Sequence, residues 1–140
     1  MIWSNKPQLE QLNQLCQKTL CEHLNMKFTE VGPDYLVATL PVDQTTKQPL
    51  GLLHGGASLA LAESLGSIDS AFCIDQSKKA PVGIEINGNH LKSARSGLVT
   101  GKVTPIRLGQ NLHVWNIYIH NESQELICVS RLTVMIIDKK

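Results

Sequence analysis

The sequence predicts an α+β fold in which one antiparallel sheet curls around a single apolar helix. Three observations lead to this class. The length of 140 residues fits one domain, 1–140. A segment from about residue 56 to 74 is apolar nearly all round, and a helix without a polar face belongs in an interior. The chain after residue 82 reads as consecutive strands without alternating helices, which argues against a doubly wound sheet.

The elements expected before the apolar helix are short. Residues 8–24 carry leucines at an approximately helical period. Residues 26–31 and 34–42 are rich in β-forming residues, and the pair Gly32-Pro33 between them is a turn signal. We therefore expect one helix and then two strands before the apolar helix begins.

Four strands are expected after the apolar helix, near residues 82–91, 97–106, 111–120 and 125–137. The last of them is apolar on both faces in places, so its outer face needs a cover, and another subunit is the simplest one. Only 18% of the residues are charged, which also favours burial of surface between subunits.

Composition excludes several classes of function. A net charge of +1 and an aromatic content of 4% argue against nucleic acid as a partner. The four cysteines form no C-x-x-C pair and are expected to be free thiols in a reducing cytosol. The first residues lack the apolar core of a signal peptide, and no uncharged apolar run is long enough for a membrane span. We expect a soluble cytoplasmic protein.

Glu63 is the most informative residue. It lies mid-way along the apolar helix, where Asp69 is the only other charged residue. A buried carboxylate must pair, coordinate a ligand or shift its pKa upward, and the last option suits a general base. Ser67 follows one turn later and would face the same site. The structural alternatives are an ion pair of Glu63 with an arginine of a strand, and close packing at Ser67.

The second feature is His54-Gly55-Gly56, which precedes the apolar helix. The first N–H groups of a helix lack internal partners, and the helix dipole favours negative charge there. Such groups can polarise a carbonyl oxygen. The helix start and Glu63, about two turns further on, could then act on one bound carbonyl group. The alternative is that the glycines only permit a tight entry to the helix.

Other chemical signatures are missing or ambiguous. The chain has no G-x-S-x-G, no P-loop, no H-E-x-x-H and no paired metal-ligand spacing, so no metal site is expected. The basic residues between 90 and 107 indicate either a solvated face or a small basic mouth for a phosphorylated ligand.

The run from Gly51 to Ser67, Gly-Leu-Leu-His-Gly-Gly-Ala-Ser-Leu-Ala-Leu-Ala-Glu-Ser-Leu-Gly-Ser, resembles the hotdog-fold acyl-CoA thioesterases. The branch is that of the helix-glutamate 4-hydroxybenzoyl-CoA thioesterase and the phenylacetate-pathway thioesterases. Similarity is closer to the enteric esterases that act on 1,4-dihydroxy-2-naphthoyl-CoA or proofread an aryl carrier protein. It covers essentially the whole chain, including residues 1–3, 40–43 and 82–87.

The resemblance implies roles for the residues around the start of the apolar helix. Glu63 matches the family's carboxylate, which acts as nucleophile or as base on water. Gly55 matches the backbone N–H that polarises the thioester carbonyl. Gln48 and His54 match residues that place the thioester or the leaving thiolate, and Ser67 matches a hydroxyl one turn beyond the carboxylate.

Three further residues are implied as substrate-binding. His90 falls near the acyl pocket of the other subunit, and Arg95 and Arg107 are carried over as contacts to the pantetheine and phosphates. The enteric relatives have a more basic run where this chain has Leu91-Lys92-Ser93-Ala94.

The activity that the resemblance implies is hydrolysis of acyl-CoA, with a preference for aromatic acyl groups. No metal or organic cofactor is needed, because CoA arrives as part of the substrate. Dimers with two composite sites are implied, commonly joined into tetramers as dimers of dimers. A hotdog hydratase or dehydratase, and a non-catalytic module that binds acyl-CoA or an acyl carrier protein, remain the alternatives. The acyl group, CoA against carrier protein, and nucleophile against base all stay open.

Overall fold

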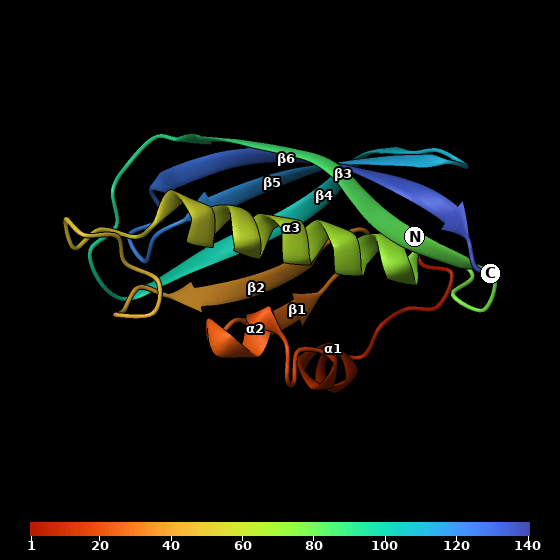
Figure 1. Cartoon of the computed structure of the whole chain (residues 1–140), viewed down its shortest axis with the longest axis horizontal. Helices are drawn as coiled ribbons and strands as arrows, with labels where there is room; N and C mark the ends of the chain where they lie inside the picture. Colours follow the sequence, from red (N-terminus) through yellow and green to blue (C-terminus); the bar gives the residue numbers. More distant parts are fainter.

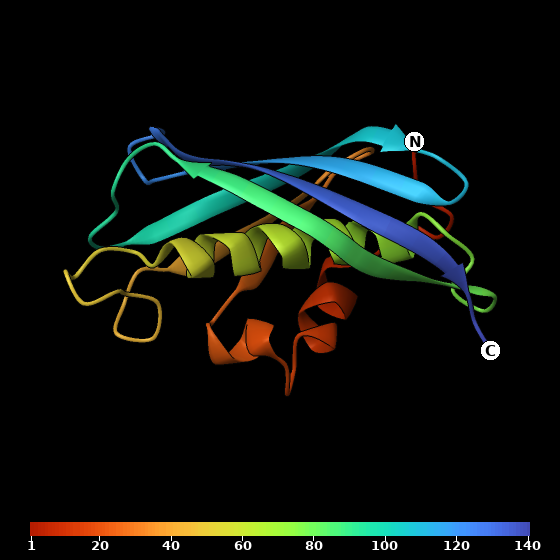
Figure 2. The ribbon, with the colours of Figure 1, turned by 45° about the horizontal axis from the view of Figure 1, so that its top comes forward.

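The computed structural model describes all 140 residues, and it confirms the α+β class (Figure 1). Six strands form one sheet in the order β1-β2-β4-β5-β6-β3, with every neighbouring pair antiparallel. The long helix α3 lies along the concave side of this sheet (Figure 2). The elements are α1 (Leu9–Leu15), α2 (Leu20–His23), β1 (Lys27–Val31), β2 (Leu36–Pro41), α3 (Gly55–Phe72), β3 (Lys79–His90), β4 (Leu98–Leu108), β5 (Leu112–His120) and β6 (Leu126–Asp138).

The small residues of α3 explain how closely it approaches the sheet. A side chain at Gly66 would begin 2.5 Å from a methyl group of Leu132 and 3.5 Å from the ring of Trp115. Leu61 and Leu65 on the same helix are fully buried. Helix and sheet therefore share one core, as expected of a helix without a polar face.

The N-terminal helix is not continuous, and the expected single helix over 8–24 is wrong. Helix α1 ends at Leu15, and Lys18 takes a left-handed conformation with φ of 61°. The hydroxyl of Thr19 then accepts a hydrogen bond from the N–H of Cys21, which begins α2. A threonine at this position favours a new helix start over continuation.

The strands fall close to their expected places, with β3 three residues longer at its start. β3 forms one edge of the sheet, and its pairing with β6 is irregular between Gly83 and Glu85. Val82 and Ile84 on this edge are 41% and 50% exposed. The expected cover for the outer face of β6 is not supplied by this chain, because Met135 and Ile137 are exposed.

Helix α3 and strand β3 lie side by side and run in opposite directions. A side chain at Gly88 would begin 2.5 Å from Leu59, and one at Gly83 would begin 2.5 Å from the Glu63 carboxylate. The end of β3 therefore lies beside the start of α3. None of the helices has both the length and the hydrophobicity that a membrane crossing needs.

Candidate active site

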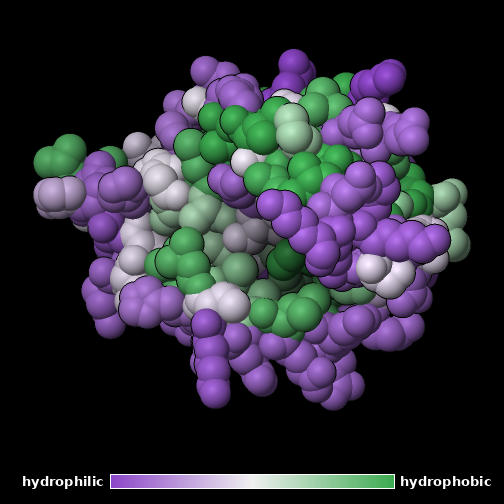
Figure 3. Space-filling model, turned by 45° about the vertical axis from the view of Figure 1, so that its right-hand side comes forward, coloured by the Kyte–Doolittle hydropathy of each residue, from purple (hydrophilic) through white to green (hydrophobic).

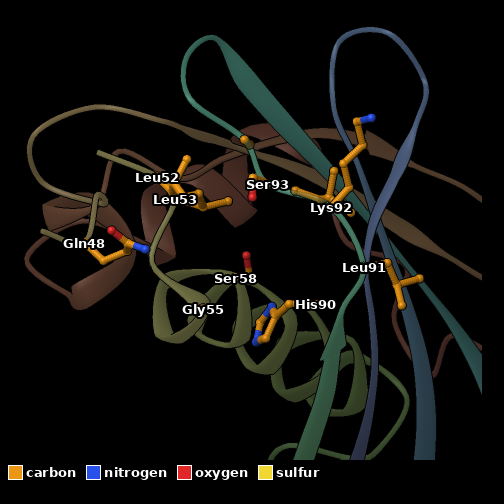
Figure 4. A pocket seen from close by; sticks show the side chains of 11 residues that line it. Gln48, Leu52, Leu53, Gly55, Ser58, His90, Leu91, Lys92 and Ser93 are labelled. Atoms are coloured by element: carbon orange, nitrogen blue, oxygen red, sulfur yellow. The ribbon is translucent and has the colours of Figure 1, made fainter. Parts of the chain in front are cut away.

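A pocket of about 340 Å³ opens at the start of α3 (Figure 4). Its walls come from the loop before α3, the first turn of α3, the end of β3 and the loop that follows β3. The residues that line it are Gln48, Leu52, Leu53, Gly55, Ser58, His90, Leu91, Lys92, Ser93, Ala94 and Ile127.

The start of α3 presents one free backbone donor to this pocket. His54 caps the helix, because its Nδ1 accepts a hydrogen bond of 2.7 Å from the N–H of Gly56. The N–H groups of Ala57 and Ser58 are bonded to the carbonyl oxygen of His54. The N–H of Gly55 makes no hydrogen bond within the chain. The helix dipole adds to its ability to polarise a carbonyl oxygen.

The resemblance assigns Gln48 and His54 a shared task, but only Gln48 lines the pocket. The side-chain oxygen of Gln48 accepts from the N–H of Leu50 at 2.5 Å, which leaves its amide nitrogen free and directed into the pocket (Figure 4). The exposed ring of His54 is used as the helix cap and does not line the pocket.

His90 lies in the pocket beside Gly55 of the same chain. A side chain at Gly55 would begin 2.8 Å from the Nε2 atom of His90, so only glycine leaves room for this arrangement. The resemblance implied a histidine near the pocket of the other subunit. Within the single chain, His90 lies at the helix start of its own chain, because β3 runs back along α3.

The pocket also contains two hydroxyl groups that the sequence reasoning missed. Ser58 is 2% exposed, and its hydroxyl makes no hydrogen bond within the chain. The hydroxyl of Ser93 lies across the pocket from it (Figure 4). Ser58 comes three residues after Gly55, and this helical spacing was the available signal for a shared face. Ser93 carried no such signal, because its loop has no period.

Glu63 and Ser67 lie outside this pocket. Eight residues of α-helix separate Gly55 from Glu63, a rise of about 12 Å. The two groups of one chain therefore cannot both contact one carbonyl group. Glu63 is half-buried, forms no ion pair with an arginine, and directs its carboxylate to Gly83 of the edge strand β3.

The basic residues do not gather at one mouth. Arg95 lines a second cleft of about 310 Å³ beside the pocket. Arg107 lies near the far end of β4, and nine strand residues from Leu98 correspond to about 30 Å. Lys102 covers the ring of Tyr35 at 4.1 Å. Arg95 and Arg107 of one chain therefore do not share a site.

Deeper in the core, α3 carries polar groups that are separate from the pocket. The hydroxyl of Ser70 accepts a 2.6 Å hydrogen bond from the indole of Trp115 and lies 2.9 Å from Nδ1 of His113. Burial lowers the pKa of His113. Burial also raises the pKa of Asp69 to about 8. No group of three or more His, Cys, Asp or Glu side chains comes together as a metal site would require.

Comparison with known proteins points to one family. A family model described as the thioesterase superfamily matches residues 50–128. A 1,4-dihydroxy-2-naphthoyl-CoA hydrolase of Escherichia coli is 48% identical over 98% of this chain and 100% of its own length. A proofreading thioesterase of Cronobacter turicensis, EntH, is 43% identical over 97% of this chain and 98% of its own.

Solved structures agree with these relatives. The crystal structure of a mutant thioesterase from Pseudomonas aeruginosa superposes with a TM-score of 0.98 at 42% identity, covering 99% of this chain and 100% of that one. A thioesterase from Haemophilus influenzae gives a TM-score of 0.95 at 48% identity, covering 99% and 96%. The sheet wrapped around a helix is therefore the hotdog fold, as the sequence resemblance implied.

Proposed function

The chain belongs to the thioesterase superfamily and is a thioester hydrolase, and from that premise we propose that it hydrolyses acyl-CoA with a preference for aromatic acyl groups. The observation that carries the proposal is the unbonded N–H of Gly55 at the wall of the 340 Å³ pocket. A thioester carbonyl oxygen bound there gains a donor at the point where negative charge develops. One such donor is worth roughly 10²–10³ in rate.

The aromatic preference is supported by a relative and by the pocket wall. The relative of 48% identity is a hydrolase of 1,4-dihydroxy-2-naphthoyl-CoA. Leu52, Leu53 and Ile127 give the pocket an apolar side that a ring can cover. The reaction consumes water and yields the free acid and CoA as a thiol. The residues therefore need only activate the nucleophile, stabilise the negative charge that develops on the carbonyl oxygen, and position the thioester.

The carboxylate in this proposal comes from a second copy of the chain. Glu63 is about 12 Å from Gly55 along its own helix, but its carboxylate lies under the free edge of β3. An exposed edge strand with Val82 and Ile84 uncovered favours pairing with another strand. Two-fold pairing of β3 with itself would extend the sheet across two chains.

The residues that face the helix limit the register of such a pairing. Ile86 and Gly88 both lie opposite buried or inward residues of β6. Antiparallel neighbours share a face, and among the registers that this allows we place the two-fold axis near Asn87, which sets Ile86 of one chain against Gly88 of the other. His90 then lies opposite the irregular stretch at Gly83. This places Gly55 of one chain near Glu63 of its copy.

The residues have distinct tasks in this composite site. The Gly55 N–H polarises the carbonyl, and the free amide of Gln48 and the ring of His90 orient the thioester beside it. In one route Glu63 of the partner subunit attacks the carbonyl carbon, the C–S bond breaks, and water then hydrolyses the resulting acyl-glutamate anhydride. In the other route its carboxylate removes a proton from a water that attacks the carbonyl carbon, and the C–S bond breaks. In both routes a proton from the water ends on the departing CoA thiolate. Ser67, one turn beyond Glu63, stays a candidate to hydrogen-bond the same substrate from that side.

We also propose that two such dimers join as a tetramer. The support is the outer sheet face, where Ile106, Met135 and Ile137 are exposed in the single chain. Figure 3 shows apolar side chains exposed among polar ones on one side of the molecule. Large exposed apolar patches mark interaction sites more often than they stay in water.

The test is thiol release from acyl-CoAs that range from acetyl through long-chain to benzoyl and dihydroxynaphthoyl. Glu63→Gln keeps the shape of the side chain and should fold, yet lose roughly 10²–10⁴ in kcat because it cannot act as base or nucleophile. Glu10→Gln, an exposed change on α1, serves as the matched control and should keep wild-type turnover. Near-normal turnover of Glu63→Gln would remove this residue from the chemistry, and binding without any turnover would favour a non-catalytic module.

A further inference from the structure

A second cleft adjoins the pocket and shares part of its wall. Its volume is about 310 Å³, and Lys92, Ser93 and Ala94 line both hollows. A ligand whose thioester lies beside Gly55 can therefore extend past Lys92 into this cleft. Nothing in the proposed chemistry uses the cleft, although Arg95 also lines it.

The charges around the second cleft cancel. Two positively charged side chains, Lys92 and Arg95, line it together with two negatively charged ones, Glu122 and Glu125. The carboxylate of Glu122 packs on Gly97 and accepts a hydrogen bond from the N–H of Leu98 at 3.3 Å. A mouth that bound phosphates by charge would be expected to carry an excess of positive side chains.

Glu125 is held in position by the turn between β5 and β6. Its Oε2 atom lies 2.9 Å from the ammonium group of Lys92, and its Oε1 atom accepts a 3.0 Å hydrogen bond from the amide of Asn121. The side-chain oxygen of Asn121 in turn accepts from the N–H groups of Ser123 and Glu125. Both carboxylate oxygens are therefore occupied.

Two further facts bear on this ion pair. The hydrogen bond from Asn121, followed by that from Lys92, lowers the pKa of Glu125, so the carboxylate is ionised at neutral pH. The side chains of Lys92 and Glu125 are both about half exposed, so salt in the solvent screens their attraction. Exposed ion pairs are usually poorly ordered, whereas the turn between β5 and β6 holds the Glu125 carboxylate in one position.

We propose that Glu125 is a specificity-determining residue, which holds Lys92 and cancels its charge so that the phosphates of CoA add little to binding. This inference rests on the proposed function, because it takes the ligand of the adjoining pocket to be a CoA thioester. The consequence is weak discrimination between CoA and ligands that share its pantetheine arm but lack its nucleotide. Removing the charge of Glu125 frees Lys92 for the phosphates.

The test compares binding of CoA and of pantetheine to the intact protein by calorimetry at low salt. Glu125→Gln should lower the Kd for CoA by about threefold to fivefold, the range that exposed ion pairs support. Its Kd for pantetheine, which has no phosphate, should stay unchanged. The gain should vanish at about 0.5 M salt, where screening shortens the reach of exposed charges. Asp138→Asn, which breaks the exposed pair with Lys79 at the other end of β3, is the matched control.

A double variant distinguishes two causes of a gain in CoA affinity. One is the release of Lys92 from its ion pair, and the other is the loss of repulsion between the Glu125 carboxylate and the phosphates. Lys92→Gln combined with Glu125→Gln should lose the gain in CoA affinity that Glu125→Gln shows alone. An unchanged Kd for CoA in Glu125→Gln, or equal changes for CoA and pantetheine, would overturn the inference, as would a gain that survives in the double variant. Turnover of acyl-CoA by the wild-type chain is measured separately, so failure of the proposed function is distinguishable from failure of this inference.

Discussion

Two carboxylates of helix α3, those of Glu63 and Asp69, differ in how deeply they are buried. Glu63 is half-buried beside a free sheet edge, whereas Asp69 is fully buried and its Oδ2 atom has no hydrogen-bond partner. Burial raises the pKa of Asp69 to about 8, the thiol of Cys73 lowers it in part, and the charge of Asp34 raises it further. Asp69 is therefore largely protonated in the folded chain near neutral pH.

The protonation of Asp69 predicts how stability depends on pH. An unfolded aspartate titrates near pH 3.9, so the folded chain holds the proton more tightly. The contribution of Asp69 is fully present below about pH 4 and is lost as the pH rises to about 8, by up to about 1.4 kcal/mol per pH unit. Asp69→Asn cannot ionise and should show a flatter dependence. Urea unfolding of both proteins at several pH values between 5 and 8 measures the slopes, and equal slopes would contradict the pKa shift.

At the scale of elements, the contact of α3 with β3 decides where the Glu63 carboxylate lies. Gly83 leaves the space, because a side chain there would begin 2.5 Å from Oε2 of Glu63. Gly83→Ala should displace the carboxylate and lower kcat by roughly tenfold to a hundredfold, as misplacements of about 1 Å do. Thermal unfolding should change little by comparison, since Gly83 is exposed on an edge strand.

Thr133→Ala provides the control for Gly83→Ala. Thr133 lies on the neighbouring strand β6 and pairs with Glu85, but its side chain points to the outer face. This variant should keep wild-type kcat. A Gly83→Ala protein with full kcat would show that the position of the carboxylate does not depend on this contact.

The elements also show how far sequence reasoning reaches. The apolar helix and the six strands could be predicted, because their patterns follow directly from burial on all sides or on one face. The break at Lys18 could not, since leucines at 15 and 20 continue a helical period while the Thr19 cap interrupts it. At that point the helix cap at Thr19 has a stronger effect on the structure than the spacing of the leucines.

The candidate site was predicted in parts. Gly55 and Gln48 share a pocket as their motif implied, whereas the place of His90 depends on how β3 returns along α3, which no local pattern records. Within one chain Arg107 lies far from Arg95, because twelve positions in an extended chain cover far more space than the same number in a helix. The buried hydroxyl of Ser58 was overlooked among the small residues of the helix.

For the whole molecule, the account depends on two copies of the chain. One chain supplies a pocket with a free Gly55 N–H, and separately a carboxylate about 12 Å away under an exposed strand edge. In the proposed mechanism, neither half completes a thioesterase site alone. The proposed pairing through β3 covers Val82 and Ile84 and brings the two halves together, so assembly and activity should be inseparable.

The most direct test of this account is complementation between two inactive variants. Glu63→Gln removes the carboxylate half, and Gln48→Ala damages the pocket half, so each protein alone should hydrolyse benzoyl-CoA poorly. The two chains are co-expressed with different tags, and mixed dimers are purified through both tags under conditions that separate tetramers into dimers. One of the two sites of each mixed dimer then regains both intact halves. We expect these mixed dimers to recover about half of the wild-type kcat per dimer, the share that one intact site of two supplies. Mixed dimers as inactive as the two parent proteins would contradict a site shared between two chains.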